Sequence, residues 1–191
     1  MKICKPLHAL WGTLATCLLL AVSTASWANP DAEVIVDVDS AKREMRVLRG
    51  DKVLARFDHV SVGRWGVSDQ KRIGDGKTPL GQYRIAWVKP SGQFGPFLGF
   101  DYPSIARART GLAAGEISQG EFDAILEAHV EGRIPPQNTR LGGNIGIHGL
   151  GRGDPGIHWD LNWTKGCIAV TNEQMNEVAR LVGKGALVRI R

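Results

Sequence analysis

Short segments rich in β-branched residues, separated by glycine-containing turns, fill the first half of this 191-residue chain. Such segments predict strands, because a branched β-carbon packs well on a pleated surface. Two of them flank a turn around Gly50, which predicts a hairpin. The glycine- and proline-rich stretch 89–115 is expected to be turn and loop. We expect a mainly β chain, with strands at residues 34–38, 44–48, 53–57, 59–63, 82–88, 145–149 and 185–190.

Only two segments carry the pattern of an amphipathic helix. Ser118 and Glu121 form a capping-box pattern ahead of apolar residues at helical spacing, and Thr171 with Gln174 repeats it. His129 falls on the apolar face of the first segment, which favours a packed histidine over a catalytic one. The chain is therefore expected to combine its strands with two amphipathic helices, beginning near residues 118 and 171.

Residues 1–28 have the features of a secretory signal peptide. Lys2 and Lys5 precede a largely apolar run, and Ser26-Trp27-Ala28 is a small-x-small cleavage site. A retained membrane anchor is the alternative, but the interrupted apolar run is marginal for a permanent span. We therefore expect an exported protein with one domain at residues 29–191 and no stable membrane insertion after cleavage.

Cleavage would leave Cys167 as the only cysteine, because Cys4 and Cys17 lie in the removed segment. A lone thiol in an oxidising compartment has no intramolecular disulfide partner, and nucleophilic chemistry is the obvious reason for its presence. The removed segment contains Lys2 and Lys5 and no acidic residue, so cleavage lowers the formal net charge from +5 to +3. Such a charge would suit a protein that works beside an anionic polymer, and it is equally ordinary for a solvated surface. No basic block with interleaved aromatics indicates nucleic acid as a partner.

The residues best suited to chemistry lie within 145–171. Strand alternation puts Ile145 and Ile147 on one face and His148 on the other. The two isoleucines can therefore enter the core while His148 faces a cleft. A thiol needs a base or a positive potential to attack an acyl carbon, and His148 is the first candidate partner for Cys167. Backbone N–H groups around Gly166 and Cys167 would stabilise a tetrahedral oxyanion.

Together these motifs resemble the L,D-transpeptidase catalytic domain family, the YkuD type. The resemblance rests on three patterns: Ile147-His148-Gly149, then Thr164-x-Gly166-Cys167-Ile168 with the cysteine nineteen residues after the histidine, and upstream Val60-Ser61-Val62-Gly63 followed by Gly76-Lys77-Thr78-Pro79-Leu80-Gly81. It extends from about residue 33 to the end of the chain. It implies a β-sandwich-like catalytic domain of the bacterial periplasm or cell envelope that needs neither a metal nor an organic cofactor.

The resemblance also implies a reaction on peptidoglycan stem peptides, which would be both donor and acceptor. In the family, the cysteine matching Cys167 attacks the carbonyl of the residue before a terminal D-amino acid. That residue leaves, and the thioester passes its acyl group to an amine of a neighbouring stem. The resemblance makes His148 the base and the backbone at Gly166 part of the oxyanion site. Whether an envelope protein directs the enzyme stays open.

Two neighbours of Cys167 depart from the family pattern. Lys165 stands where many members have a second histidine, and Ala169 stands where they have a basic residue, often arginine. The run Gly-Cys-Ile-Ala-Val-Thr-Asn is instead similar to a subgroup that includes enzymes cleaving bonds to peptidoglycan. Three functions therefore stay open: acyl transfer to an amine, hydrolysis or amidase action on the same scaffold, and non-catalytic cell-wall binding.

Several side chains near the motifs are candidates for substrate contacts. Lys165 either supplies positive charge near the thiolate or is a solvated loop residue, and His158 is either a second base or an ordinary loop histidine. Trp159 and Trp163 either form a wall of the cleft or pack the loop, and the same two readings apply to the aromatics Phe94, Phe97, Phe100 and Tyr102. The full candidate set is Gly149, Arg152, His158, Trp159, Thr164 and Lys165.

Overall fold

The computed structural model describes Met1 and residues 32–191. Apart from Met1, the predicted signal segment 1–28, with Cys4 and Cys17, lies outside the described residues. Among those that are described, no helix combines the length and the apolar character needed to cross a bilayer.

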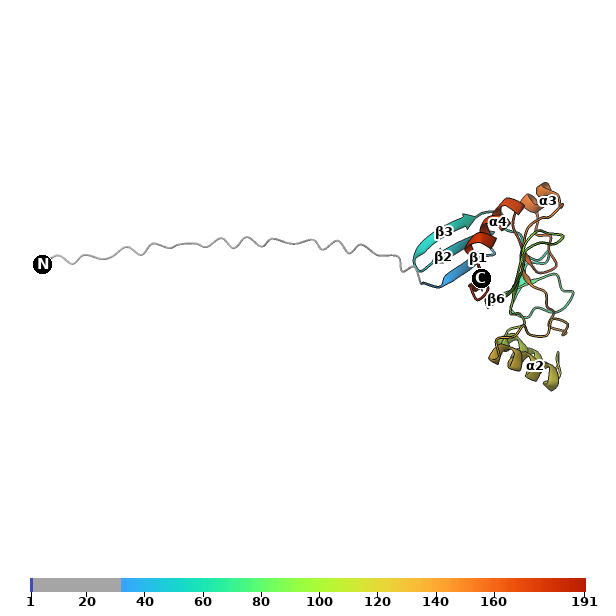
Figure 1. Ribbon diagram of the computed structural model, residues 1–191. Coiled ribbons are helices and arrows are strands. Elements are labelled where there is room, and N and C mark those ends of the chain that lie inside the picture. Colours follow the sequence, from blue (N-terminus) through green and yellow to red (C-terminus); the bar gives the residue numbers. More distant parts are fainter. Residues whose placement is uncertain (2–31) are drawn as a thin grey trace.

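Within residues 32–191, eight strands form one sheet in the order β3-β2-β1-β10-β6-β7-β8-β9. Figure 1 shows β3, β2 and β1 side by side at the N-terminal end of the described residues. Neighbouring strands are antiparallel, except that β1 pairs with β10 and β8 with β9 in parallel. A separate pair is formed by β4 (Val67–Ser68) and β5 (Thr78–Pro79). The strands of the main sheet are β1 Val34–Asp39, β2 Glu44–Arg49, β3 Lys52–Phe57, β6 Gly81–Lys89, β7 Phe97–Phe100, β8 Gly146–His148, β9 Ile168–Ala169 and β10 Leu187–Ile190.

The mainly β architecture and all but one of the predicted strands are confirmed. The exception is the segment 59–63, which does not form a regular strand, because His59 has a φ of 60°, outside the extended region. What remains are two isolated bridges, Ser61 to Ala169 and Gly63 to Thr164. These bridges connect the segment after β3 to the chain on both sides of Cys167.

The prediction of two helices was incomplete, because residues 32–191 contain four. The predicted helices are α2 and α4, and both begin with the expected capping boxes, Ser118 with Glu121 and Thr171 with Gln174. The stretch predicted as loop contains α1 and strand β7, and α3 follows Asp154, whose carboxylate caps it. The helices are α1 Ile105–Ala113, α2 Gln119–Val130, α3 Pro155–Asp160 and α4 Asn172–Leu181.

The main core fills the space between the sheet and α4. Met175 and Val178 of α4 are fully buried in one cluster with strand residues such as Ile147 and Ile168. A smaller cluster lies under α1 and α2, at the end of the domain away from α3 and α4 (Figure 1), and consists of Ala108, Ile117, Ile125 and Leu141. The strands that carry the site are therefore supported from behind by α4.

We predict that Met175→Ala lowers the free energy of unfolding by about 2–5 kcal/mol, because it leaves a cavity between α4 and the sheet. The exposed Arg180→Ala on the same helix should change it by less than about 0.5 kcal/mol. Urea denaturation of both variants measures the difference. Equal stability of the two variants would show that α4 does not complete the core.

Candidate active site

The strand pair β8–β9 brings the predicted nucleophile and base into one cavity. Ile147 pairs with Ile168, and both side chains are fully buried. Alternation along the two strands therefore puts His148 and Cys167 together on the other face. Both line a cavity of about 450 Å³, here called the thiol cleft, together with Arg64, Gln93, Phe94, Trp163, Thr164 and Lys165.

A backbone carbonyl holds the imidazole of His148. Nδ1 lies 2.7 Å from the carbonyl oxygen of Gly149. Because that oxygen can only accept, Nδ1 carries the hydrogen, and the neutral ring keeps its lone pair on Nε2. Burial lowers the pKa of His148 below its ordinary value, although the bond to Gly149 opposes this shift. At neutral pH the ring is therefore uncharged and has one nitrogen available as a base.

Aromatic rings surround that imidazole. Ring centroids lie 4.8 Å away for Phe94, 5.8 Å for Trp163 and 6.5 Å for Phe97. Phe94 and Trp163 also form apolar walls of the thiol cleft. Phe94 of the aromatic segment therefore lines the cleft, whereas Phe100 and Tyr102 are buried in the core. Each of the two interpretations of this segment holds for part of it.

Two threonines hold the carbonyl oxygen of Cys167. Thr164 Oγ1 donates to it over 2.7 Å and accepts the N–H of Gly166 over 3.1 Å. Thr78 Oγ1 donates to the same oxygen over 3.4 Å and accepts the N–H of Gly63 over 2.8 Å. Thr78 of the Thr-Pro-x-Gly signature therefore stabilises the turn that carries the thiol of Cys167.

Gly166 adopts a backbone conformation that favours glycine, with a φ of 135°. A Cβ at this position would lie 2.7 Å from the carbonyl oxygen of Lys77 and 3.1 Å from Nζ of Lys71. A larger residue would therefore collide with the loop that follows β4.

The thiol of Cys167 is partly buried and donates to the carbonyl oxygen of Asn144, with Sγ 3.3 Å away. Burial raises its pKa to about 11, although a backbone hydrogen bond from Gly146 and the positive charge of Lys71 oppose the shift. The thiol is therefore protonated at neutral pH. Attack on an acyl carbon then requires a base that takes the proton during the reaction, and neutral His148 lines the same cleft.

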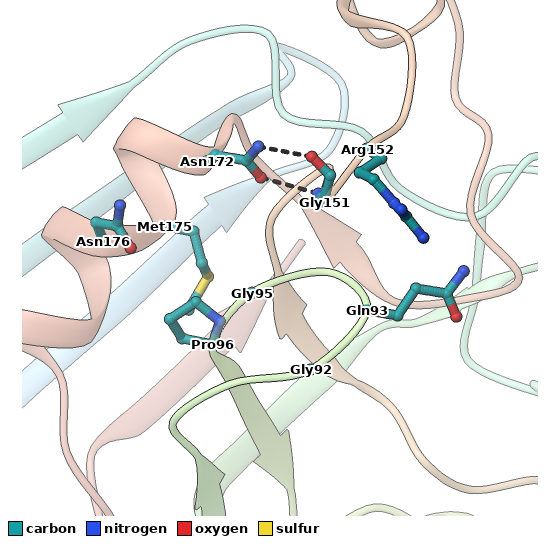
Figure 2. Close-up of a pocket in the computed structure, with 9 residues that line it drawn as sticks. All are labelled: Gly92, Gln93, Gly95, Pro96, Gly151, Arg152, Asn172, Met175 and Asn176. Atoms are coloured by element: carbon teal, nitrogen blue, oxygen red, sulfur yellow. Dashed lines mark hydrogen bonds between the residues drawn. The ribbon is translucent and has the colours of Figure 1, made fainter.

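Of the predicted substrate contacts, Thr164 and Lys165 line the thiol cleft. Gly149 does not, and its observed role is to hold His148. Arg152 lines a neighbouring cavity of about 510 Å³ between the loop 92–96 and α4 (Figure 2). There the side-chain amide of Asn172 accepts a hydrogen bond from the N–H of Gly151 and donates one to the carbonyl oxygen of Gly151. Gln93 lines both cavities, which therefore adjoin.

His158 and Trp159 also do not line the thiol cleft. His158 is fully buried behind Trp163, whose indole Nε1 donates to its Nδ1 over 3.3 Å. Burial, together with the nearby charge of Arg43, lowers the pKa of His158 to about 4. Trp159 is 43% exposed and packs edge-on against His59. His158 therefore supports a wall of the cleft through Trp163.

Sequence reasoning missed two basic residues at the site. Arg64 lines the thiol cleft, and it also lines an adjoining cavity of about 380 Å³ together with Lys71 and Lys165. Lys71 is buried, and its Nζ lies 2.8 Å from a carboxylate oxygen of Asp75. Both residues are far from Cys167 in the sequence. The only signal was their position within the glycine-rich stretch 63–81 that contains the Thr-Pro-x-Gly motif.

A family model described as the L,D-transpeptidase catalytic domain matches residues 33–190. The chain belongs to this family. The resemblance to this family that the sequence motifs indicated is thereby confirmed. No curated protein matches the chain significantly.

Solved structures share the fold of this L,D-transpeptidase domain at low sequence identity. The helical cell shape determining protein Pgp2 from Campylobacter jejuni is 22% identical, with a TM-score of 0.55 over 84% of this chain and 48% of that chain. Bd1075 from Bdellovibrio bacteriovorus is 16% identical, with a TM-score of 0.53 over 84% and 48%. An L,D-transpeptidase from Enterococcus faecium is 14% identical, with a TM-score of 0.50 over 83% and 50%. The chain thus spans about half the length of these proteins.

We predict that the alkylation rate of Cys167 by iodoacetamide rises about tenfold per pH unit from pH 7 to pH 10, because the thiolate is the reactive form and the thiol pKa is raised to about 11. Peptide-level mass spectrometry follows this one cysteine. Glutathione, measured beside it, should level off above its own lower pKa. A plateau for Cys167 near neutral pH would indicate a preformed thiolate and contradict the assignment of a neutral pair.

Proposed function

We propose that this protein is an exported cysteine acyltransferase that acts on peptidoglycan stem peptides through a thioester at Cys167. Membership of the L,D-transpeptidase family supports the class of substrate. The observation that carries the proposal is the presence of Cys167 and His148 on one face of the β8–β9 pair and in one cleft. The other proposed properties, export and action in the periplasm or cell envelope, rest on the signal-like segment 1–28.

In the first half-reaction, the donor stem lies in the thiol cleft with its last peptide bond at Cys167. Nε2 of His148 takes the thiol proton while sulfur attacks the carbonyl carbon before the terminal D-residue. We assign the oxyanion contact to the N–H of Cys167, because the N–H of Gly166 already donates to Thr164. When the intermediate collapses, the C–N bond breaks and His148 returns the proton to the leaving amine. The D-residue departs and a thioester remains.

In the second half-reaction, an amine of a neighbouring stem attacks the thioester carbon. His148 takes a proton from the amine, the C–S bond breaks, and the thiol is restored. Water in place of the amine gives hydrolysis, and the surroundings of Cys167 favour this as the second candidate. Because residue 169 is an alanine, no basic side chain stands two residues after the nucleophile. Lys165 is exposed at the edge of the cleft.

The proposed biological role is peptidoglycan biosynthesis and cell-wall organisation. Pgp2, which shares the fold, is a helical cell shape determining protein. We propose that this chain likewise influences cell shape, because crosslinking or trimming of stem peptides changes the mechanical connections of the wall.

Purified tetrapeptide muropeptides test this proposal. We predict crosslinked dimers or exchange of the terminal D-residue, both abolished by Cys167→Ala. His148→Ala should lower the rate by about 100-fold or more, because the base is lost. The control His129→Gln, on α2 and outside the thiol cleft, should stay within about twofold of the wild type. Liquid chromatography with mass spectrometry identifies the products.

Each other outcome of that assay has a definite meaning. Stem peptides that are only shortened or released identify a hydrolase on the same scaffold. Absence of turnover, together with undiminished binding of Cys167→Ala to sacculi, would overturn the enzymatic proposal and favour a non-catalytic cell-wall-binding module.

A further inference from the structure

The cavity that adjoins the thiol cleft is lined by three basic side chains, Arg64, Lys71 and Lys165. Arg64 and Lys165 also line the thiol cleft, so the two spaces meet at these residues. No acidic residue is among the described residues that line this cavity, called here the basic cavity. Its remaining lining is small or apolar: Ile73, Gly74, Gly76, Gly142, Gly143 and Ile145.

Lys71 forms the buried end of the basic cavity, and its side chain has one donor to spare. The residue is only 2% exposed, and a buried ammonium is costly unless it is paired. Nζ donates to Asp75 over 2.8 Å and to the carbonyl oxygen of Arg72 over 3.3 Å. Asp75 also accepts the backbone N–H groups of Arg72 and Lys77. Because an ammonium has three hydrogens, two bonds leave one for a ligand.

This ammonium lies beside the turn that carries the nucleophile. A Cβ on Gly166 would be 3.1 Å from Nζ, so the absence of a side chain lets the ammonium approach the turn closely. The charge of Lys71 also opposes the effect of burial on the thiol of Cys167. An anionic group bound by Lys71 would therefore lie close to the reacting sulfur.

We propose that the basic cavity binds the free α-carboxylate of the departing D-residue, with Lys71 at its buried end and Arg64 and Lys165 at its rim. This inference rests on the proposed function. In a donor stem, that carboxylate is three covalent bonds from the attacked carbonyl carbon, nearer than any other carboxylate of the stem. The glycines of the cavity leave room for a small side chain on the same residue. The protein therefore selects terminal peptide bonds over internal ones.

A pair of donor peptides tests the proposal by turnover: a tetrapeptide stem with a free terminal carboxylate, and the same stem with a terminal carboxamide. The wild type should prefer the acid in kcat/KM by about tenfold to a hundredfold, the range for hydrogen bonds to a charged group. Lys71→Met should abolish this preference, and Arg64→Met and Lys165→Met should each reduce it several-fold. In each of these variants kcat/KM should fall for the acid peptide and change little for the amide peptide.

Lys52→Met is the matched control, because this exposed lysine begins β3 at the far end of the strand order. It should keep the full preference for the acid. An equal loss on both peptides in Lys71→Met would assign Lys71 to thiol activation and overturn the carboxylate site. If Lys71→Met does not fold, the variants of the exposed Arg64 and Lys165 provide the test. An unchanged preference for the acid peptide in both Arg64→Met and Lys165→Met would also overturn the carboxylate site.

Equilibrium binding to Cys167→Ala separates this inference from the proposed function. Titration of the two peptides, followed by NMR or calorimetry, should show tighter binding of the acid. The added Lys71→Met change should remove this difference, and the added Lys165→Met change should reduce it several-fold. Equal affinities would overturn the carboxylate site even if the wild type turns over stems. Tighter binding of the acid without turnover would leave the site standing and overturn the proposed reaction. Failure of both peptides to bind would overturn both.

Discussion

The carbonyl oxygen of Cys167 is the point at which separate parts of the chain are joined. It accepts hydrogen bonds from Thr164, within the same turn, and from Thr78, in the Thr-Pro-x-Gly segment. Thr78 in turn holds the N–H of Gly63. These bonds set where the sulfur lies relative to β8, and hence relative to His148. Loss of either hydroxyl would leave a buried polar group without its partner and loosen the turn.

The electrostatics of the site keep the thiol of Cys167 and the imidazole of His148 neutral at pH 7. Burial raises the pKa of the thiol and lowers that of the imidazole, so an ion pair between them is disfavoured before substrate arrives. A protonated thiol also reacts slowly with oxidants, which is compatible with the export that we propose for this chain. In our account the positive charge of the site lies in the basic cavity, where Lys71, Arg64 and Lys165 bind the terminal carboxylate of the donor stem.

Strand alternation and capping boxes were enough to predict the mainly β fold, α2 and α4, because these patterns depend on nearby residues. The family motifs singled out His148 and Cys167, and both residues line one cleft in the structure. Strand β7 was missed because it lies in a glycine- and proline-rich stretch and becomes a strand only by pairing with β6 and β8 on either side. His59 interrupts a predicted strand through one positive φ. Lys71 carries no local signal beyond its place in the glycine-rich stretch 63–81, since its position beside Gly166 is produced by folding.

The most direct test of the account is the mass of the protein during turnover of a tetrapeptide stem, quenched in acid and read by mass spectrometry with peptide mapping. We predict an adduct on Cys167 equal in mass to the acyl portion of the stem, formed with release of the terminal D-residue and absent in Cys167→Ala. Release of the D-residue without any adduct on Cys167, and at an undiminished rate in Cys167→Ala, would contradict the account.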